Sequence, residues 1–241
     1  MNVARAKKEV TIILPAYNEA LHIEKCVQEV ERAVSSLSDS YEIIVAEDGS
    51  TDETHRIIAS LAGTNPKVSF LHSPVRLGKG KAIKNALGTA KGEVVVFMDV
   101  DLSTSLTSLP QILTLVRKHG GMVIGSRHIK GSKVQRHTSR TLFSLAYNMF
   151  VRMLFMDNIR DHQCGFKAMS REAAEVLRDV KSDGFFFDTE MILRCKKLGF
   201  PVIEVKVEWT ENRRKSESKV RLFHDAKKIG MDMLTFRLDP R

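Results

Sequence analysis

Two aspartates separated by one residue, Asp99 and Asp101, are the residues of this sequence best suited to hold a metal ion. They follow the apolar run EVVVFM, which predicts a buried strand over residues 93–98. Two carboxylates at the end of a strand can reach the same ion if the backbone bends there. Hard oxygen ligands suit Mg²⁺ or Mn²⁺, and either ion would bridge a diphosphate and neutralise the charge of a leaving group. The alternative interpretation is a polar turn that ends the strand.

Three further polar clusters also follow predicted strands. Asp48 is suited to accept hydrogen bonds from a base or ribose, and the alternative is that it forms a turn. Glu19 is also suited to accept such hydrogen bonds, and the alternative is that it stabilises a helix N-terminus. Ligands of open α/β sheets bind beyond the carboxyl ends of the strands, so four clusters in such places indicate one ligand site. No GxGxxG motif is present, which leaves a dinucleotide site unsupported. The three clusters and the strands they follow are Pro15–Glu19 after 9–14, Asp48–Ser50 after 41–46, and Arg76–Lys79 after 67–71.

Strand patterns alternate with helical periodicity over residues 9–125. Asn18 is expected to cap a helix over about residues 19–37, and Ser50 or Thr51 to cap the next one. This alternation is typical of an α/β fold with an open, mostly parallel sheet, and no linker divides the 241 residues, so we expect one domain. The remaining predicted elements are helices ending near Ala90, over about 106–118, from Ser170, over about 188–198 and at the C-terminus, and strands at 121–125, 165–169 and 202–207.

The middle of the chain combines positive charge with apolar character. No acidic residue lies between Asp101 and Asp157, and residues 141–156 are largely apolar except for Arg152. An anionic membrane interface attracts such a segment, whereas the alternative is a solvated basic loop followed by a core helix. Arg127 and Arg140 could bind a phosphate through bidentate hydrogen bonds, and the alternative is that both are solvated arginines. Aromatic residues make up only 7% of the chain, so we do not expect a nucleic-acid partner.

The composition is that of a globular protein with an anionic partner. The net charge is +9, and hydrophobic residues account for 43% of the chain. Three cysteines without a CxxC pair indicate reduced thiols rather than a disulfide framework. The sequence contains no apolar run of spanning length, and its first residues lack a secretory h-region, so the expected location is cytoplasmic.

Short motifs recur along nearly the whole chain. They are PAYNE (Pro15–Glu19), EDGSTD (Glu47–Asp52), RLGKGKA (Arg76–Ala82), DVDLST (Asp99–Thr104), GSR (Gly125–Arg127), Arg140 and Ser144 before Asn148, DHQCGFKAMSR (Asp161–Arg171), FDTE (Phe187–Glu190) and RRKSESK (Arg213–Lys219). Taken together, these motifs resemble the family-2 glycosyltransferases of the GT-A fold, and among them the enzymes that load a hexose onto dolichyl or other polyprenyl phosphate. The DLST run and the DHQCGFK block favour the β-glucosyl branch over the mannosyl branch. The resemblance implies a Rossmann-like, mixed but mostly parallel sheet flanked by helices, with a nucleotide-binding half (9–125) and an acceptor-binding half (126–241).

The resemblance also implies a role for each matching residue. Two positions depart from the mannosyl members, which have Gln at Ser103 and Gly at Ser216; the first weakens the metal assignment and the second reduces the flexibility expected of the loop. The implied roles are nucleotide binding by Pro15, Tyr17, Glu19, Asp48, Lys79 and Asp99; metal binding by Asp99, Asp101 and Ser103; contact with the lipid phosphate by Arg127 and Arg140; an acidic group near the sugar in Glu190; and a lid over the phosphates containing Arg213, Ser218 and Lys219.

These roles imply a mechanism. The second pKa of a phosphate monoester is about 6, so a lipid phosphate needs alignment rather than a general base. We expect inverting transfer from UDP-glucose, or secondly GDP-mannose, at the cytosolic face of a membrane. Contact with the membrane would come from residues 136–156 or from a membrane-anchored partner subunit. The alternatives are transfer to a polysaccharide or protein hydroxyl, with Asp188 or Glu190 as base, and a nucleotidyltransferase that makes sugar nucleotides.

Overall fold

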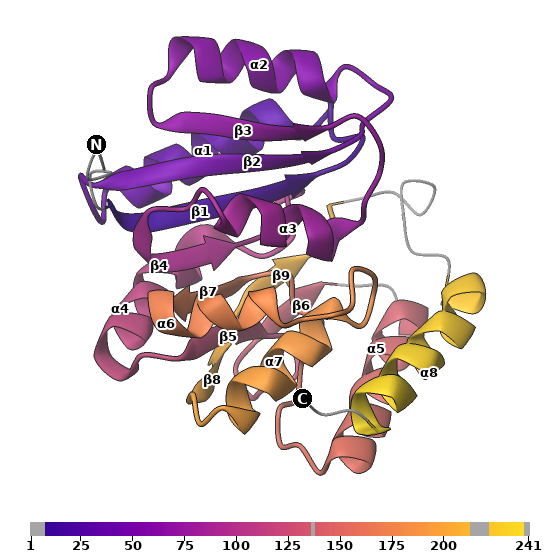
Figure 1. Cartoon of the computed structure of the whole chain (residues 1–241). Coiled ribbons are helices and arrows are strands. Elements are labelled where there is room, and N and C mark those ends of the chain that lie inside the picture. The colour runs from indigo at the N-terminus through magenta and orange to yellow at the C-terminus, as the bar shows by residue number, and fades with distance from the viewer. Residues whose placement is uncertain (1–7, 136–137, 213–221, 239–241) are drawn as a thin grey trace, which may run out of the picture.

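The computed structural model describes residues 8–135, 138–212 and 222–238, with backbone only at 138–140 and 222–228. Seven strands form one sheet in the order β3-β2-β1-β4-β7-β5-β8 (Figure 1). Two short strands, β6 and β9, form a second sheet. The strands are β1 (Lys8–Ala16), β2 (Tyr41–Asp48), β3 (Val68–Ser73), β4 (Gly92–Phe97), β5 (Met122–Ser126), β6 (Lys133–Gln135), β7 (Lys167–Ser170), β8 (Val202–Lys206) and β9 (Glu208–Thr210).

The large sheet is mixed but mostly parallel, as the sequence predicts. β1 pairs in parallel with β2 and β4, β2 with β3, and β5 with β8. β7 alone is antiparallel, and it lies between β4 and β5. The helices are α1 (Ile23–Ser35), α2 (Thr54–Thr64), α3 (Lys79–Leu87), α4 (Leu109–His119), α5 (Thr138–Phe155), α6 (Arg171–Ala174), α7 (Phe187–Lys197) and α8 (Leu222–Leu238), with 3₁₀ turns η1 (Leu106–Ser108) and η2 (Glu175–Arg178).

Each face of the sheet carries its own apolar core. Along the central strand β1, Ile12 and Leu14 belong to the core under α1, α2 and α4, while Ile13 belongs to the core under α3, α6 and α7. Successive side chains of a strand point to opposite faces, so a strand covered on both faces must be apolar throughout. Cys26, Cys164 and Cys195 are buried free thiols, which agrees with the expected absence of a disulfide framework.

The first helix begins later than the sequence suggests. α1 starts at Ile23 after His22, so the prediction that Asn18 caps it is wrong. Asn18 has a φ of 51°, and its backbone N–H donates to Ser50 Oγ at 2.9 Å. Its side chain is used by the next loop, because Thr51 N donates to Asn18 Oδ1 at 2.8 Å. The turn after β1 is therefore tied to the turn after β2.

In the second half of the chain, α5 and α8 pack against each other beside α7. Figure 1 shows α5 and α8 side by side at one corner of the molecule, away from β1–β3. A third apolar cluster joins Tyr147 and Val151 of α5 to Phe186 and to the buried side of α8. Phe155 of α5 lies edge-on to Phe236 of α8, with ring centroids 5.7 Å apart.

Candidate active site

The polar clusters that follow β1, β2, β3 and β4 lie at one edge of the sheet. These four strands are parallel and adjacent, so their carboxyl ends point the same way. The sequence-based prediction that the PAYNE, EDGST, RLGK and DVD segments converge is therefore confirmed. Tyr17 lies beneath Arg76, whose guanidinium carbon is 4.1 Å from the centre of the tyrosine ring. The loops after β1 and β3 are thus in contact.

Asp48 is buried and fixes the loop that leads into α3. Its Oδ1 accepts a hydrogen bond from Leu77 N at 2.7 Å, and its Oδ2 accepts one from Gly78 N at 2.9 Å. Gly78 has a φ of 105°, and a Cβ there would lie 2.8 Å from the carbonyl oxygen of Asp183, so the turn requires glycine. The structure therefore places Asp48 where it shapes the loop before Lys79.

Lys79 links the DVD motif to α7. Its Nζ lies 2.8 Å from Asp99 Oδ1 and 3.8 Å from Asp188 Oδ2. Asp188 Oδ1 in turn receives a 2.6 Å bond from Nζ of the buried Lys167, which comes from β7. Burial acts to lower the pKa of Lys79, but the charges of Asp188 and Asp99 raise it above its usual value. Both lysines and both aspartates form one alternating charge cluster at the sheet edge.

The DVD carboxylates fit a divalent cation. They offer the oxygen donors that Mg²⁺ and Mn²⁺ prefer, and a cationic group, the Lys79 ammonium, already lies against Asp99. Gly165 makes room for this carboxylate, because a Cβ at that position would lie 1.8 Å from Asp99 Oδ2. Asp101 Oδ1 accepts the backbone N–H of Ser103 at 3.0 Å, which holds the turn after Asp101.

Arg127 lies at the end of β5 in a buried ion pair with Asp161. Its Nε and Nη2 donate to the two carboxylate oxygens at 2.7 and 2.8 Å, and its backbone N–H adds a third bond at 2.9 Å. Burial acts to raise the pKa of Asp161, but the arginine charge holds it below its ordinary value. Asp161 is the first residue of the DHQCGFK block, so this pair joins two of the sequence motifs.

Glu190 supports a loop. Its Oε1 accepts from Lys181 N at 2.9 Å and from Arg194 Nε at 2.7 Å, while its Oε2 accepts from Ser182 N at 2.9 Å. Burial acts to raise the pKa of this carboxyl, but these hydrogen bonds lower it below the ordinary value. The supported loop reaches α3, because the carbonyl of Asp183 accepts from Gly80 N at 3.1 Å.

Four predicted residues lie outside what the structure describes: the side chain of Arg140, and Arg213, Ser218 and Lys219. The residue that precedes this last segment is placed, however. Asn212 Nδ2 donates to the carbonyl oxygens of Asp101 and Leu102 at 3.0 and 3.1 Å. The chain therefore enters the predicted lid segment directly beside the DVD motif.

One face of the α5–α8 pair is apolar and exposed. Ten of the fifteen exposed large apolar side chains in the described part of the chain lie on α5, on α8 or directly after α5. Along α5 they recur at helical spacing, and Leu142, Met149 and Met153 are 69%, 61% and 74% exposed. The opposite side of α5 is buried and polar where Ser144 and Asn148 lie, and Asn148 Oδ1 accepts the backbone N–H of His162 at 2.9 Å. Among the described residues, no helix has the length and apolar character needed to cross a bilayer.

Sequence reasoning missed the partners of the predicted residues. From the sequence, no individual role was assigned to Asp161 or Lys167. Asp188 was considered only as the base of the alternative reaction. Their signal was present in the DHQCGFK and FDTE segments, but pairings such as Arg127 with Asp161 span 34 residues and depend on the fold.

Comparison with known proteins identifies the family of the chain. Residues 11–178 match the family described as "Glycosyl transferase family 2". Glycosyltransferase AglD of Haloferax volcanii is 40% identical over 230 residues, which cover 94% of this chain and 36% of AglD. Dolichyl-phosphate beta-glucosyltransferase ALG5C of Trichomonas vaginalis is 32% identical over 215 residues, which cover 83% of this chain and 64% of ALG5C. The chain thus spans less than two thirds of both relatives.

A solved structure with the same fold supports the architecture. Glucosyl-3-phosphoglycerate synthase from Mycobacterium tuberculosis, solved with Mn²⁺, uridine diphosphate and phosphoglyceric acid, superposes with a TM-score of 0.69 at 21% identity, covering 95% of this chain and 78% of that one. The mixed sheet flanked by helices is therefore that of GT-A glycosyltransferases, and the chain belongs to glycosyl transferase family 2.

Proposed function

We propose that this protein transfers a hexose, with inversion, from a nucleotide sugar to a polyprenyl phosphate. UDP-glucose is the favoured donor and GDP-mannose the second. The proposal is carried by the alternating charge cluster of Lys79, Asp99, Lys167 and Asp188, at the sheet edge where the loops after β1 to β4 converge. Support for the acceptor comes from relatives named dolichyl-phosphate beta-glucosyltransferase, among them the human protein at 29% identity over 96% of this chain and 75% of its own length.

The nucleotide would lie along the loops after β1 and β2, with its diphosphate toward Asp99 and Asp101. Mg²⁺ or Mn²⁺ on these carboxylates supplies positive charge to the departing diphosphate. Lys79 is 2.8 Å from Asp99 and carries a raised pKa, so it stays charged and close enough to contact the same phosphates. Tyr17 and Arg76 border the pocket expected for the nucleoside.

The hydrogen bonds of the acidic residues indicate which kind of acceptor the site suits. A hydroxyl acceptor needs a base, and Glu190 has both oxygens engaged by Lys181, Ser182 and Arg194. Asp188 Oδ1 is engaged by Lys167. A phosphate acceptor needs no base, since it is largely dianionic at neutral pH. The occupied carboxylates therefore favour the phosphate over the hydroxyl alternative.

Arg127 is proposed to face the lipid phosphate through the part of its guanidinium that Asp161 does not use. The ion pair with Asp161 uses Nε and Nη2 of Arg127, and it fixes the guanidinium at the end of β5. Arg140 and the Arg213–Lys219 segment are proposed to complete the phosphate site. The exposed apolar face of α5 and α8 is proposed to rest on the cytosolic surface of a membrane, where the acceptor resides.

A donor screen tests the proposal. The purified protein is incubated with a short polyprenyl phosphate, Mg²⁺ or Mn²⁺, and UDP-glucose, GDP-mannose or another nucleotide sugar, and the released nucleoside diphosphate is measured. We expect UDP release that depends on the lipid phosphate. Pyrophosphate release with a nucleoside triphosphate and sugar phosphate would instead support the nucleotidyltransferase alternative.

A further inference from the structure

The histidines at the far edge of the sheet form a cluster that the transfer reaction does not use. Glu47 and His72 are direct register partners near the ends of β2 and β3, and His55 is the second residue of α2. Alternation along the strands puts Glu47 on the face of Val45 and His72 on the face of Phe70, both of which pack in the core under α2. The three side chains therefore meet where this core reaches solvent.

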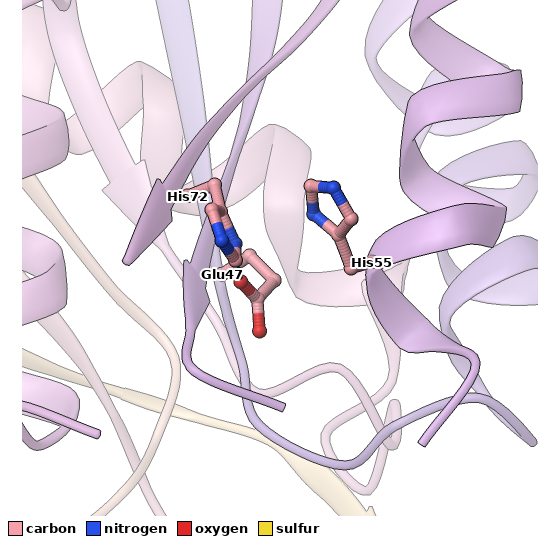
Figure 2. Close-up of side chains that lie close together, drawn as sticks. All are labelled: Glu47, His55 and His72. Carbon is pink, nitrogen blue, oxygen red and sulfur yellow. Dashed lines mark hydrogen bonds and ion pairs between the residues drawn. The ribbon is translucent and has the colours of Figure 1, made fainter. Parts of the chain in front are cut away.

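Their geometry is that of converging ligands. One nitrogen or oxygen from each residue lies within 4.8 Å of the other two. Figure 2 shows the three side chains in the space between the ends of β2 and β3 and the start of α2. His72 Nδ1 is 2.5 Å from Glu47 Oε2, and the two imidazole rings lie 4.2 Å apart between centroids. Within the described ranges, the buried Nδ1 of His55 has no hydrogen-bond partner.

We propose that Glu47, His55 and His72 form a binding site for Zn²⁺, separate from the DVD carboxylates. Two imidazole nitrogens and one carboxylate oxygen are ligands that Zn²⁺ takes at about 2.0–2.2 Å, with a fourth position left for water. The DVD motif instead offers only oxygen and follows β4, which β1 separates from β2.

Binding needs only small movements. Ligands of one tetrahedral ion lie about 3.3 Å apart, so the ion would replace the hydrogen bond between His72 and Glu47 and draw His55 inward. Glu47 is suited to the ion because its Oε2 already points toward an imidazole ligand, His72 Nδ1, at 2.5 Å. His72 is 41% exposed, which leaves a path from solvent.

The bound ion would stabilise the EDGST turn. Glu47 Oε1 accepts from Ser50 N at 2.5 Å, and Glu47 directly precedes Asp48, which holds the loop before Lys79. The site would thus tie α2 and β3 to the turn that carries Asp48. The expected effect of the ion is on stability, and the site stands whether or not the proposed transfer reaction is correct.

Titration of the purified protein with Zn²⁺ in excess Mg²⁺ tests the site, because Mg²⁺ occupies oxygen ligands but not imidazoles. We expect one equivalent of bound Zn²⁺ and a higher melting temperature. His72→Ala and Glu47→Gln should each weaken binding at least about 10-fold, while His119→Ala, at an exposed histidine on α4, should not.

Co²⁺ provides a second readout that does not depend on stability. We expect visible d–d absorption in the wild-type protein and its loss in His55→Ala. His72 is partly exposed, so His72→Ala should melt near the metal-free wild-type temperature, which separates loss of a ligand from loss of the fold. Unchanged Zn²⁺ affinity in His72→Ala, equal loss in His119→Ala, or no stoichiometric binding would overturn the proposal.

Discussion

At the carboxyl edge of β1 to β4 the charged side chains hold one another, whereas on the outer face of α5 and α8 large apolar side chains face solvent. Asp48, Asp99 and Asp188 each contact a donor within 3 Å. Met149 and Met153 are instead more than half exposed. A small, highly charged donor requires fixed charges, and a lipid acceptor requires an apolar surface. The proposed function uses one region for each.

The largest effect is expected from the DVD carboxylates. Asp99→Asn and Asp101→Asn should each lower turnover about 10³-fold, because charge neutralisation of the leaving diphosphate is worth several kcal/mol. Steady-state assays with saturating donor measure this. Glu172→Gln, at an exposed position on α6, is the matched control and should retain activity. Equal losses in all three variants would assign the effect to folding instead.

The next largest effect concerns stability. Asp161→Asn should lower the free energy of unfolding by about 3–5 kcal/mol, because it leaves the Arg127 charge buried without its partner. Urea unfolding measures the loss. The exposed Arg32–Glu29 pair serves as the comparison, and Arg32→Ala should cost about 0.5 kcal/mol or less. If the two variants lost the same amount, burial would not distinguish the pairs.

A third prediction addresses the apolar face. Met149→Glu combined with Met153→Glu should weaken binding to anionic liposomes about 10-fold or more, because two apolar side chains no longer enter the interface. Flotation measures binding. Leu198→Glu is the control, since Leu198 is 60% exposed but lies at the end of α7. If wild-type protein did not float with liposomes, with or without acceptor lipid, the membrane contact would have to come from a partner subunit.

The smallest effect is a pH dependence of stability. Hydrogen bonds from His162 and Lys196 outweigh burial and lower the pKa of Asp157, and Arg127 does the same for Asp161. A lowered folded-state pKa contributes stability above about pH 4, and this contribution is lost as the pH falls further. Urea midpoints measured between pH 7 and pH 3 should therefore decline at the acid end. Asp157→Asn should flatten that decline, and an unchanged slope would contradict the assignment.

The sequence predicted the sheet edge well because it depends on local patterns. Apolar runs followed by PAYNE, EDGST and DVD are enough to place these segments, since parallel strands end at a common edge. It predicted α1 poorly because Asn18, a good capping residue, binds Ser50 and Thr51 of the next loop instead. That competition depends on contacts between loops more than 30 residues apart.

The second half of the chain was harder to predict for a related reason. The short strand β7 enters the sheet antiparallel between β4 and β5, and nothing in four residues specifies that position. β6 and β9 were missed because each has only three residues, mostly exposed. The sequence shows that residues 141–156 combine apolar and basic side chains. Which face of this helix is buried depends on its packing against α7 and α8.

The most direct test of the account compares two acceptors that differ only in the terminal phosphate group. The purified protein, UDP-glucose and Mn²⁺ are supplied with either a short polyprenyl phosphate or the corresponding polyprenol, and glucosylated lipid is quantified by mass spectrometry. We predict product from the phosphate alone, and none when a chelator is in excess. Product from the alcohol, or equal product in excess chelator, would contradict base-free transfer assisted by the DVD carboxylates.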